Sequence, residues 1–348
     1  MPKRSKLLQS IAETIADYRE GEIPKPTPDH VDRWVLQFSK EMQEPILAEV
    51  DHVFKQTYFE KEWVLDCFNN RVKNENITGE KPRAFWRSAN FLRIQQNGHS
   101  QEELLILFGE SLKEQLNIDI DVCGKENGPF IYLDDVLFSG SRIGNDISAW
   151  LQQDAPVEAI VHIFVFAVHT LGEYQMMKRI KKDAAAAEKK IDFQLWRSIT
   201  LENRRSYRDT SEVLWPATLP GYEALKAYVE AEKKFPFEPR NPGKKLKNEI
   251  FSSEEGRQLL EREFLLAGIR IRGLCKNPAK VMRPLGFSNF GLGFGSMIVT
   301  FRNCPNNCPL ALWWGDSTTS PSSPLGQWYP LLPRKTYGRD IDFDEIWF

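Results

Sequence analysis

Four apolar runs alternate with stretches of helical spacing between residues 88 and 215, and this alternation restricts the fold more than any other feature of the chain. The runs are typical of buried strands and lie at Phe91–Ile94, Phe130–Leu133, Ala159–Val168 and Phe193–Leu201. Helical patterns separate them at Leu104–Leu116, Gly144–Leu151 and 171–190. Strands that alternate with helices are typical of a parallel sheet. We therefore predict an α/β core over residues 88–215, in which helices flank a parallel sheet.

The rest of the 348 residues is predicted to form additions to this core. Residues 1–87 read as a helical region, with an apolar stripe at Val31, Trp34, Val35, Phe38 and Met42. Residues 216–283 read as a helical insertion that a proline-rich loop interrupts, and its best helix covers 254–271. Residues 284–348 are predicted to be a strand and loop segment that packs on the core, with a glycine-rich strand at 286–301.

Two adjacent acids, Asp134 and Asp135, follow the apolar strand 130–133. In open α/β sheets, ligands bind at the edge where parallel strands end. The turn that follows, Ser139-Gly140-Ser141, is small and hydroxylated and opens a helix, so its backbone N–H groups suit a phosphate. At about 3.3 Å per extended residue, the acids lie within roughly 10 Å of this turn. Such an arrangement suits a sugar phosphate with free hydroxyls.

At these residues the sequence resembles the phosphoribosyltransferase family, whose motif is an apolar strand, two acids and a Thr/Ser-Gly-x-Thr-like phosphate loop. The resemblance implies that Asp134 and Asp135 are catalytic and bind the ribose hydroxyls. It implies that Ser139, Gly140, Ser141, Arg142 and Ile143 wrap the 5′-phosphate. It also implies Mg²⁺ bound with the substrate rather than in a metal site of the protein. Phe138 is bulkier than the residue usual in the loop, and Arg142 replaces the final Thr with a cation.

The loop before the helix at Leu104–Leu116 matches the family's pyrophosphate loop by position. Its residues are Asn97, Gly98, His99, Ser100 and Gln101. An ordinary strand–helix connection is the alternative. The chain looks most similar to a divergent branch, the conflict-system phosphoribosyltransferases found beside bacterial anti-phage modules, including some retrons. The segments that carry this similarity are residues 85–93 (Phe-Trp-Arg-Ser-Ala-Asn-Phe-Leu-Arg), the Gln-Asn-Gly-His-Ser-Gln loop at 96–101, and residues 303–310 (Asn-Cys-Pro-Asn-Asn-Cys-Pro-Leu) leading to Trp313-Trp314.

Composition limits the partners and the compartment. Lys and Arg number 46 and Asp and Glu 48, so the net charge of −2 gives no overall cationic field for nucleic acid. Residues 171–290 nevertheless hold 24 Lys and Arg against 16 Asp and Glu. There Lys178, Arg179, Lys181 and Lys182, with Arg204, Arg205 and Arg208, could form a patch for nucleic acid or an acidic protein. No apolar run approaches 18 residues and no signal peptide is evident, so we expect a cytoplasmic protein without a membrane partner.

Other chemistry-bearing residues have plainer interpretations beside the functional ones. Cys304 and Cys308 lack a second ligand pair, so a turn is favoured over a zinc site. His162 reads as a core residue, whereas His169, at a strand end, could belong to the site. Trp313, Trp314 and Trp328 could stack on a base, but core packing is favoured.

Three functions remain open. The first is an enzyme that acts on phosphoribosyl pyrophosphate or a related nucleotide at the ribose anomeric carbon, as a defence effector. The second is a non-catalytic nucleotide sensor, and the third is a nucleic-acid- or protein-binding accessory subunit of a defence complex.

Overall fold

The computed structural model describes residues 3–96, 100–232, 236–289 and 291–335. The chain forms two compact units. The middle unit is Glu62–Leu201, and the terminal unit combines the described residues before Glu62 with those after Leu201. The boundaries predicted after residues 87 and 215 lie where the hydrophobic pattern of the sequence changes. The division into two units instead follows the contacts between residues in the structure. Residues 62–87 accordingly lie in the same unit as the acidic pair.

The middle unit is built on parallel strands, as the alternation of strands and helices predicts. One sheet has the order β2-β3-β5-β7, with strands Asn90–Phe91, Phe130–Leu133, Glu158–Phe164 and Lys190–Trp196. A second has the order β4-β6-β8, with strands Val136–Leu137, Ala167–His169 and Ile199–Leu201. The prediction of an α/β fold with a parallel sheet between helices is confirmed.

Each strand of the second sheet continues a strand of the first after a break of two residues. The breaks lie at 134–135, 165–166 and 197–198, so the predicted single strands 159–168 and 193–201 are each two strands. Hydrogen bonds bridge the first break, because the Asp134 N–H donates to the Phe164 carbonyl at 3.0 Å and the Phe166 N–H donates to the Asp135 carbonyl at 2.8 Å. The two acids therefore sit at a break inside the sheet rather than beyond its end.

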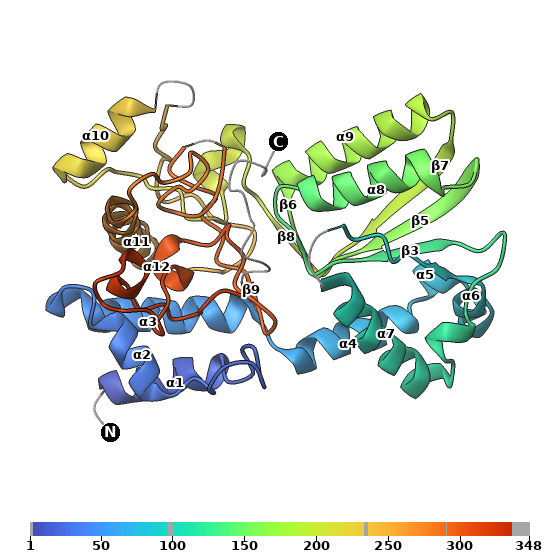
Figure 1. The fold of residues 1–348 in the computed structure, drawn as a ribbon, viewed down its shortest axis with the longest axis horizontal. Coiled ribbons are helices and arrows are strands. Elements are labelled where there is room, and N and C mark those ends of the chain that lie inside the picture. Colours follow the sequence, from blue (N-terminus) through green and yellow to red (C-terminus); the bar gives the residue numbers. More distant parts are fainter. Residues whose placement is uncertain (1–2, 97–99, 233–235, 290, 336–348) are drawn as a thin grey trace. The chain divides into compact units, whose positions relative to one another are not determined.

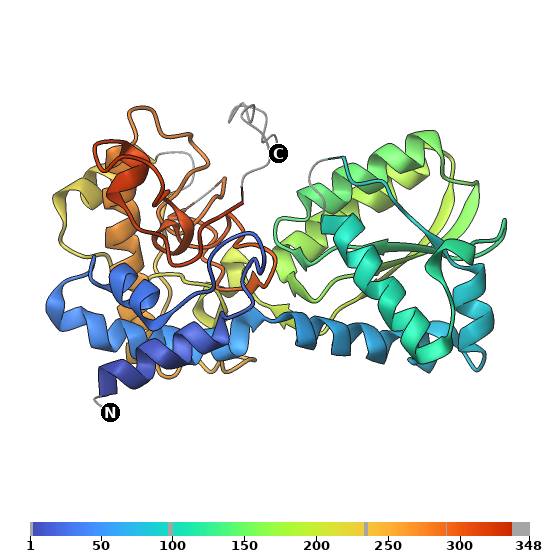
Figure 2. The ribbon, with the colours of Figure 1, turned by 60° about the horizontal axis from the view of Figure 1, so that its bottom comes forward.

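Helices cover both faces of the sheet (Figure 1). Helices α8 (Ser141–Gln153) and α9 (Thr170–Ala186) lie on one face, and α4 (Lys61–Val72), α6 (Pro82–Ser88) and α7 (Ser100–Leu116) lie on the other (Figure 2). The first face buries an aliphatic core that includes Ile147, Val161, Ile163 and Ile180. The second buries an aromatic cluster that includes Phe68, Trp86, Phe108, Phe164 and Phe166. Short helices α5 (Glu75–Thr78) and η1 (Ile120–Val122) complete the unit.

The terminal unit combines helices with long loops. Its helices are α1 (Lys3–Thr14), α2 (Pro28–Val35), α3 (Lys40–Thr57), η2 (Arg205–Thr210), α10 (Glu223–Ala231), α11 (Glu254–Leu274), α12 (Leu310–Trp313) and η3 (Pro324–Gln327). Strand β1 (Tyr58–Phe59) pairs in parallel with β9 (Val299–Thr300). The predicted stripe forms part of its core, where Val31, Trp34, Val35 and Phe38 are buried. Within the described ranges, no helix is long and apolar enough to cross a membrane.

The predicted glycine-rich strand at 286–301 is wrong except for Val299–Thr300. Gly286, Gly291, Gly293 and Gly295 all have positive φ angles, between 62° and 137°. An extended strand needs negative φ angles, so these glycines turn the chain repeatedly instead. Sequence pattern alone could not show this, because glycine is compatible with both conformations.

Candidate functional site

The acidic pair is oriented by the backbone of the break itself. The Asp135 N–H donates to Asp134 Oδ1 at 3.0 Å, and the Val136 N–H donates to Asp135 Oδ1 at 2.7 Å. Asp134 is only 4% exposed, while Asp135 is half-buried. The two neighbouring carboxyl groups thus have different surroundings, one enclosed by protein and one in partial contact with water.

The predicted phosphate loop leads into helix α8 through a left-handed glycine. Gly140 has a φ of 76° and precedes the first helical residue, Ser141. A Cβ atom at Gly140 would stand 2.6 Å from the Gly172 carbonyl oxygen, and one at Gly172 would stand 1.9 Å from the Phe138 carbonyl oxygen. Both distances are shorter than carbon–oxygen contact permits. The loop can therefore lie against the start of α9 only because both positions are glycine.

The two departures from the family motif have different structural consequences. The Phe138 ring stacks on His169, with ring centroids 5.1 Å apart. The His169 imidazole is buried and its Nδ1 donates to the Leu137 carbonyl at 3.1 Å, which makes it a support of the loop. Burial lowers the pKa of His169 to about 4, so the ring is neutral at pH 7.

The Ile143 side chain lies in the core, so that residue can offer a ligand only its backbone.

Arg142 reaches from the first turn of α8 to the acidic pair. Its Nη1 lies 3.8 Å from Asp134 Oδ1 and donates to Ser100 Oγ at 3.3 Å. About half of the Arg142 side chain is exposed, whereas the Asp134 side chain is almost fully enclosed. Arg142, which the sequence analysis assigned to the phosphate, therefore pairs with the Asp134 carboxylate in this structure.

Helix α7 begins beside the same carboxylate. Ser100 Oγ accepts a hydrogen bond from the Gln95 side-chain amide at 2.6 Å and lies 3.5 Å from Asp134 Oδ1, to which it can donate. Gln101 is buried, and its side-chain oxygen accepts the Ile94 N–H at 2.8 Å. Of the predicted pyrophosphate loop, Ser100 thus contacts Asp134 and Gln101 contacts the Leu133 carbonyl just before it, while Asn97, Gly98 and His99 lie outside the described residues.

Burial dominates the electrostatics of Asp134. Desolvation, and then the neighbouring charge of Asp135, raise its pKa to about 7, although Arg142 acts in the opposite direction. The pKa of Arg142 is raised in turn, first by Asp134 and also by Asp135 and Asp146. Asp134 can therefore exchange a proton near neutral pH, which is uncommon for a carboxyl group.

Asp146 is a third carboxyl group near the site, and the sequence analysis did not identify it. Asp146 is buried on α8, where it accepts the Tyr132 hydroxyl at 2.8 Å and the Gln96 N–H at 3.3 Å. Burial raises its pKa. The sequence does hold a signal for it, because Asp146 falls within an apolar stripe at helical spacing with Ile143, Ile147 and Trp150.

Arg71 is a second residue that sequence reasoning missed. It is buried on α4, and its Nη2 donates to the Val165 carbonyl at 2.5 Å, within the strand break beside the acidic pair. Its guanidinium carbon lies 5.6 Å and 5.2 Å from the ring centroids of Phe164 and Phe166. Arg71 thus satisfies a carbonyl at the break. No local pattern could identify it, because its partners lie about 94 positions along the chain.

The remaining candidates lie in cores or turns. His162 is buried and accepts the Trp196 indole N–H at 2.9 Å, as the core interpretation predicts. Cys304 and Cys308 are buried, and the Cys308 N–H donates to the Pro305 carbonyl across the predicted turn. Trp313, Trp314 and Trp328 are buried in the terminal unit, which agrees with core packing. In the described part of the chain, no three His, Cys, Asp or Glu side chains gather as a metal site.

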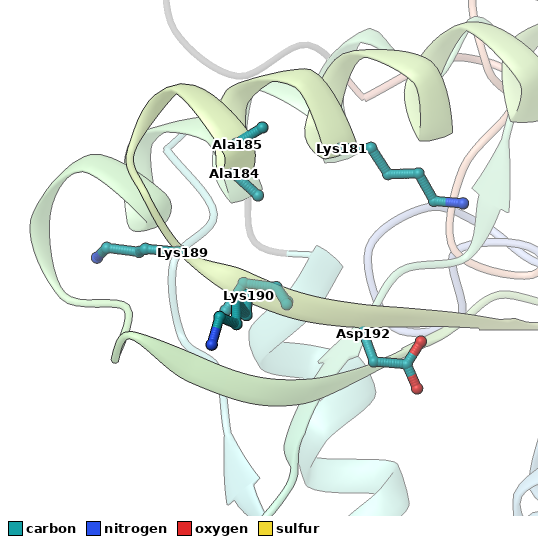
Figure 3. A pocket seen from close by; sticks show the side chains of 7 residues that line it. Lys181, Ala184, Ala185, Lys189, Lys190 and Asp192 are labelled. Carbon is teal, nitrogen blue, oxygen red and sulfur yellow. The ribbon is translucent and has the colours of Figure 1, made fainter.

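A shallow pocket of about 420 Å³ lies between α9 and the start of β7. It is at the edge of the sheet where strands begin, opposite the acidic pair. Figure 3 shows the Lys181 and Lys189 side chains pointing in opposite directions there. Lys190 pairs with Glu158 at 2.9 Å, and Lys189 donates to the Ala155 carbonyl. These lysines do not converge on one point, so the pocket does not resemble an anion site.

The predicted basic patch is divided between the two units. Lys178, Lys181 and Lys182 are exposed on α9, where Arg179 donates to Asn145 at 2.6 Å. Arg204, Arg205 and Arg208 belong to the terminal unit, where they pair with Glu202 and Glu238. Of the predicted patch, the three α9 lysines are thus exposed together in one unit, whereas the three arginines of the other unit pair with carboxylates.

Comparison with known proteins identifies a matching family. A family model described as PRTase-CE matches residues 31–334, which is most of the chain. Searches of curated proteins and of solved structures found no match.

Proposed function

Because the chain belongs to PRTase-CE, a phosphoribosyltransferase-like family of conflict systems, we propose that its acidic pair and phosphate loop bind phosphoribosyl pyrophosphate or a related nucleotide. We further propose that the protein acts at the ribose anomeric carbon as an effector of a bacterial anti-phage system, in the cytoplasm. The observation that carries this proposal is the convergence of three elements on Asp134. They are the strand break, the first turn of α8 and the start of α7.

The residues have distinct roles in this proposal. Asp134 and Asp135 accept hydrogen bonds from the ribose hydroxyls, and their negative charge favours a ring that becomes positive in the transition state. Backbone N–H groups at Ser139, Gly140 and Ser141 hold the 5′-phosphate at the positive end of α8. Ser100 and Gln101, at the start of α7, are the residues proposed to bind the diphosphate. Catalysis would then consist mainly of positioning and charge stabilisation.

Mg²⁺ fits this site as a companion of the substrate. The ion prefers phosphate oxygens and water and needs few protein ligands. Bound with the substrate, it would neutralise the diphosphate leaving group. Asp135 is the more exposed carboxylate of the pair.

Calorimetric titration with phosphoribosyl pyrophosphate and Mg²⁺ tests the proposal. Wild type should bind, and Asp134→Asn/Asp135→Asn should bind at least about tenfold more weakly, since charged hydrogen bonds to the ribose are lost. Pyrophosphate release should be followed in parallel with a panel of bases and nucleotides. Wild type that shows no binding would contradict the proposal, and Asp192→Asn, an exposed carboxylate on β7, is the matched control.

A non-catalytic nucleotide sensor is the second candidate. It is favoured by the ion pair between Arg142 and Asp134, which engages a carboxylate that an enzyme would turn toward substrate. Binding of phosphoribosyl pyrophosphate without turnover, across the whole panel, would support the sensor over the enzyme.

A role as an accessory subunit that binds nucleic acid or an acidic protein rests on the exposed lysines of α9. A salt-dependent gel shift that disappears when Lys178, Lys181 and Lys182 become Gln would support this role. Absence of any shift at low salt would exclude nucleic acid as the partner of this surface.

A further inference from the structure

We infer that Arg142 makes the site selective for phosphorylated sugars, by leaving Asp134 for the phosphate when such a ligand binds. This inference rests on the proposed function and concerns the specificity of the same site. It assigns Arg142 two alternative partners, of which the structure shows one.

The contacts of Arg142 are compatible with movement. Its distance to Asp134 Oδ1, 3.8 Å, is an ion-pair distance beyond that of a hydrogen bond, and its contact with Ser100 Oγ is long at 3.3 Å. Half of the side chain is exposed, so water reaches it. A half-exposed arginine held by one long hydrogen bond and one 3.8 Å ion pair can exchange both contacts for a phosphate.

The acidic groups near Arg142 disfavour binding of an anion in the unliganded site. Asp134, Asp135 and Asp146 all raise the pKa of Arg142, and Asp134 Oδ1 lies 3.8 Å from its Nη1. A phosphate at the N-terminus of α8 would meet these carboxylates unless a cation stood between them. Arg142 lies in the first turn of the same helix and is therefore the side chain able to provide it.

Movement of Arg142 toward the loop has two linked consequences. Its planar guanidinium can form paired hydrogen bonds with phosphate oxygens, which are stronger than neutral hydrogen bonds. At the same time Asp134 loses its counter-ion and becomes available to a ribose hydroxyl. A sugar without a phosphate provides nothing in exchange for the ion pair, so it has to bind while Arg142 still engages Asp134.

The test compares ribose 5-phosphate with ribose, in wild type, Arg142→Gln and Arg142→Lys. Calorimetry measures the phosphorylated sugar, and NMR titration into the millimolar range measures ribose. The matched control is Arg179→Gln, which removes the same charge beside the same helix but contacts Asn145 instead of the acidic pair. Thermal unfolding of each variant verifies that it is folded.

Arg142→Gln should bind ribose 5-phosphate about 10- to 100-fold more weakly than wild type, the range expected for a lost hydrogen bond to a charged group. Its affinity for ribose should stay the same or rise, because Asp134 is no longer paired. The affinity of Arg142→Lys for ribose 5-phosphate should lie between those of wild type and Arg142→Gln. Arg179→Gln should bind both sugars as wild type does.

Equal losses for both sugars in Arg142→Gln would make Arg142 a structural residue and overturn the inference. So would an unchanged affinity for ribose 5-phosphate. These outcomes are distinct from failure of the proposed function, in which wild type binds neither ribose 5-phosphate nor phosphoribosyl pyrophosphate.

Discussion

Asp134 is a carboxyl group kept in a place that disfavours its charge. It is enclosed by protein and lies next to Asp135, and Arg142, the Ser100 hydroxyl and one backbone N–H compensate its charge only in part. Burial of a charge that is incompletely paired costs free energy unless the group is neutralised. A residue that destabilises the fold in this way is typical of functional sites, where the requirement of a ligand outweighs that of stability.

The raised pKa of Asp134 predicts a pH-dependent effect of Asp134→Asn on stability. The folded state keeps the proton up to about pH 7, while the unfolded chain loses it near pH 4. The free energy of unfolding of wild type therefore falls as the pH rises between these values. Relative to wild type, Asp134→Asn should become more stable between pH 5 and pH 8, on the order of 2 kcal/mol.

Urea unfolding at the two pH values measures this difference. Asp192→Asn is the control, because that carboxylate is exposed and loses little solvation on folding. A stability difference between Asp134→Asn and wild type that is the same at pH 5 and pH 8 would contradict the prediction.

At the scale of elements, the phosphate loop and helix α9 form one packed arrangement. The loop carbonyl of Phe138 faces Gly172, and Gly140 faces the backbone and Met176 of the same helix. Sequence reasoning identified Gly140, because it stands in a recognisable motif. It missed Gly172, since nothing local distinguishes a glycine that makes room for a carbonyl 34 residues earlier in the chain.

Gly172→Ala should displace the phosphate loop. The added methyl group would stand 1.9 Å from the Phe138 oxygen, so backbone must move, at a cost of about 1–3 kcal/mol in the free energy of unfolding. Affinity for phosphoribosyl pyrophosphate should fall as well, because the loop no longer presents its N–H groups correctly. Denaturant unfolding and calorimetry measure the two effects.

Gly144→Ala provides the matched control on α8. Its Cβ atom would make an ordinary 3.4 Å contact with the flexible Arg179 side chain, and alanine favours a helix by up to about 1 kcal/mol over glycine. This variant should be as stable as wild type or more so. Loss of stability in Gly144→Ala equal to that in Gly172→Ala would show that steric contact with the loop is not the cause.

At the scale of the whole molecule, the middle unit is a continuous segment, Glu62–Leu201, that lies in the sequence between the two described parts of the terminal unit. The terminal unit has its own buried charge cluster. Glu261 pairs with Arg240 at 2.9 Å and with Arg257 at 2.8 Å, and all three side chains are almost fully buried. Arg240 also pairs with Glu254 at 2.7 Å. The candidate site around Asp134 and this cluster thus belong to separate units.

Glu261→Ala should destabilise the terminal unit alone. It leaves two buried guanidinium groups without their shared carboxylate, which costs about 3–5 kcal/mol. Scanning calorimetry should show one transition at lower temperature, while a second transition still rises on addition of phosphoribosyl pyrophosphate with Mg²⁺. Glu223→Ala, which removes an exposed carboxylate, should change neither transition. A single transition that responds to both ligand and mutation would show that the two units unfold together.

The sequence by itself determined the class of fold and the order of the elements around the acidic pair. Periodicity and turn residues are local properties, so they identified the strand 130–133, the acids after it, the glycine of the loop and the helix that follows. The division of two predicted strands at 165–166 and 197–198 was not visible, because Val165 and Phe166 continue the apolar pattern.

Only the tertiary structure decided the surroundings of those residues. The contacts of Asp134 with Ser100 and Arg142, and of Arg71 with Val165, join segments far apart in the chain. The raised pKa of Asp134 follows from burial, which depends on every element packed around it. Local sequence therefore specified which groups are present, whereas non-local packing set their charge states and partners, because solvation and Coulomb interactions depend on distance in space rather than along the chain.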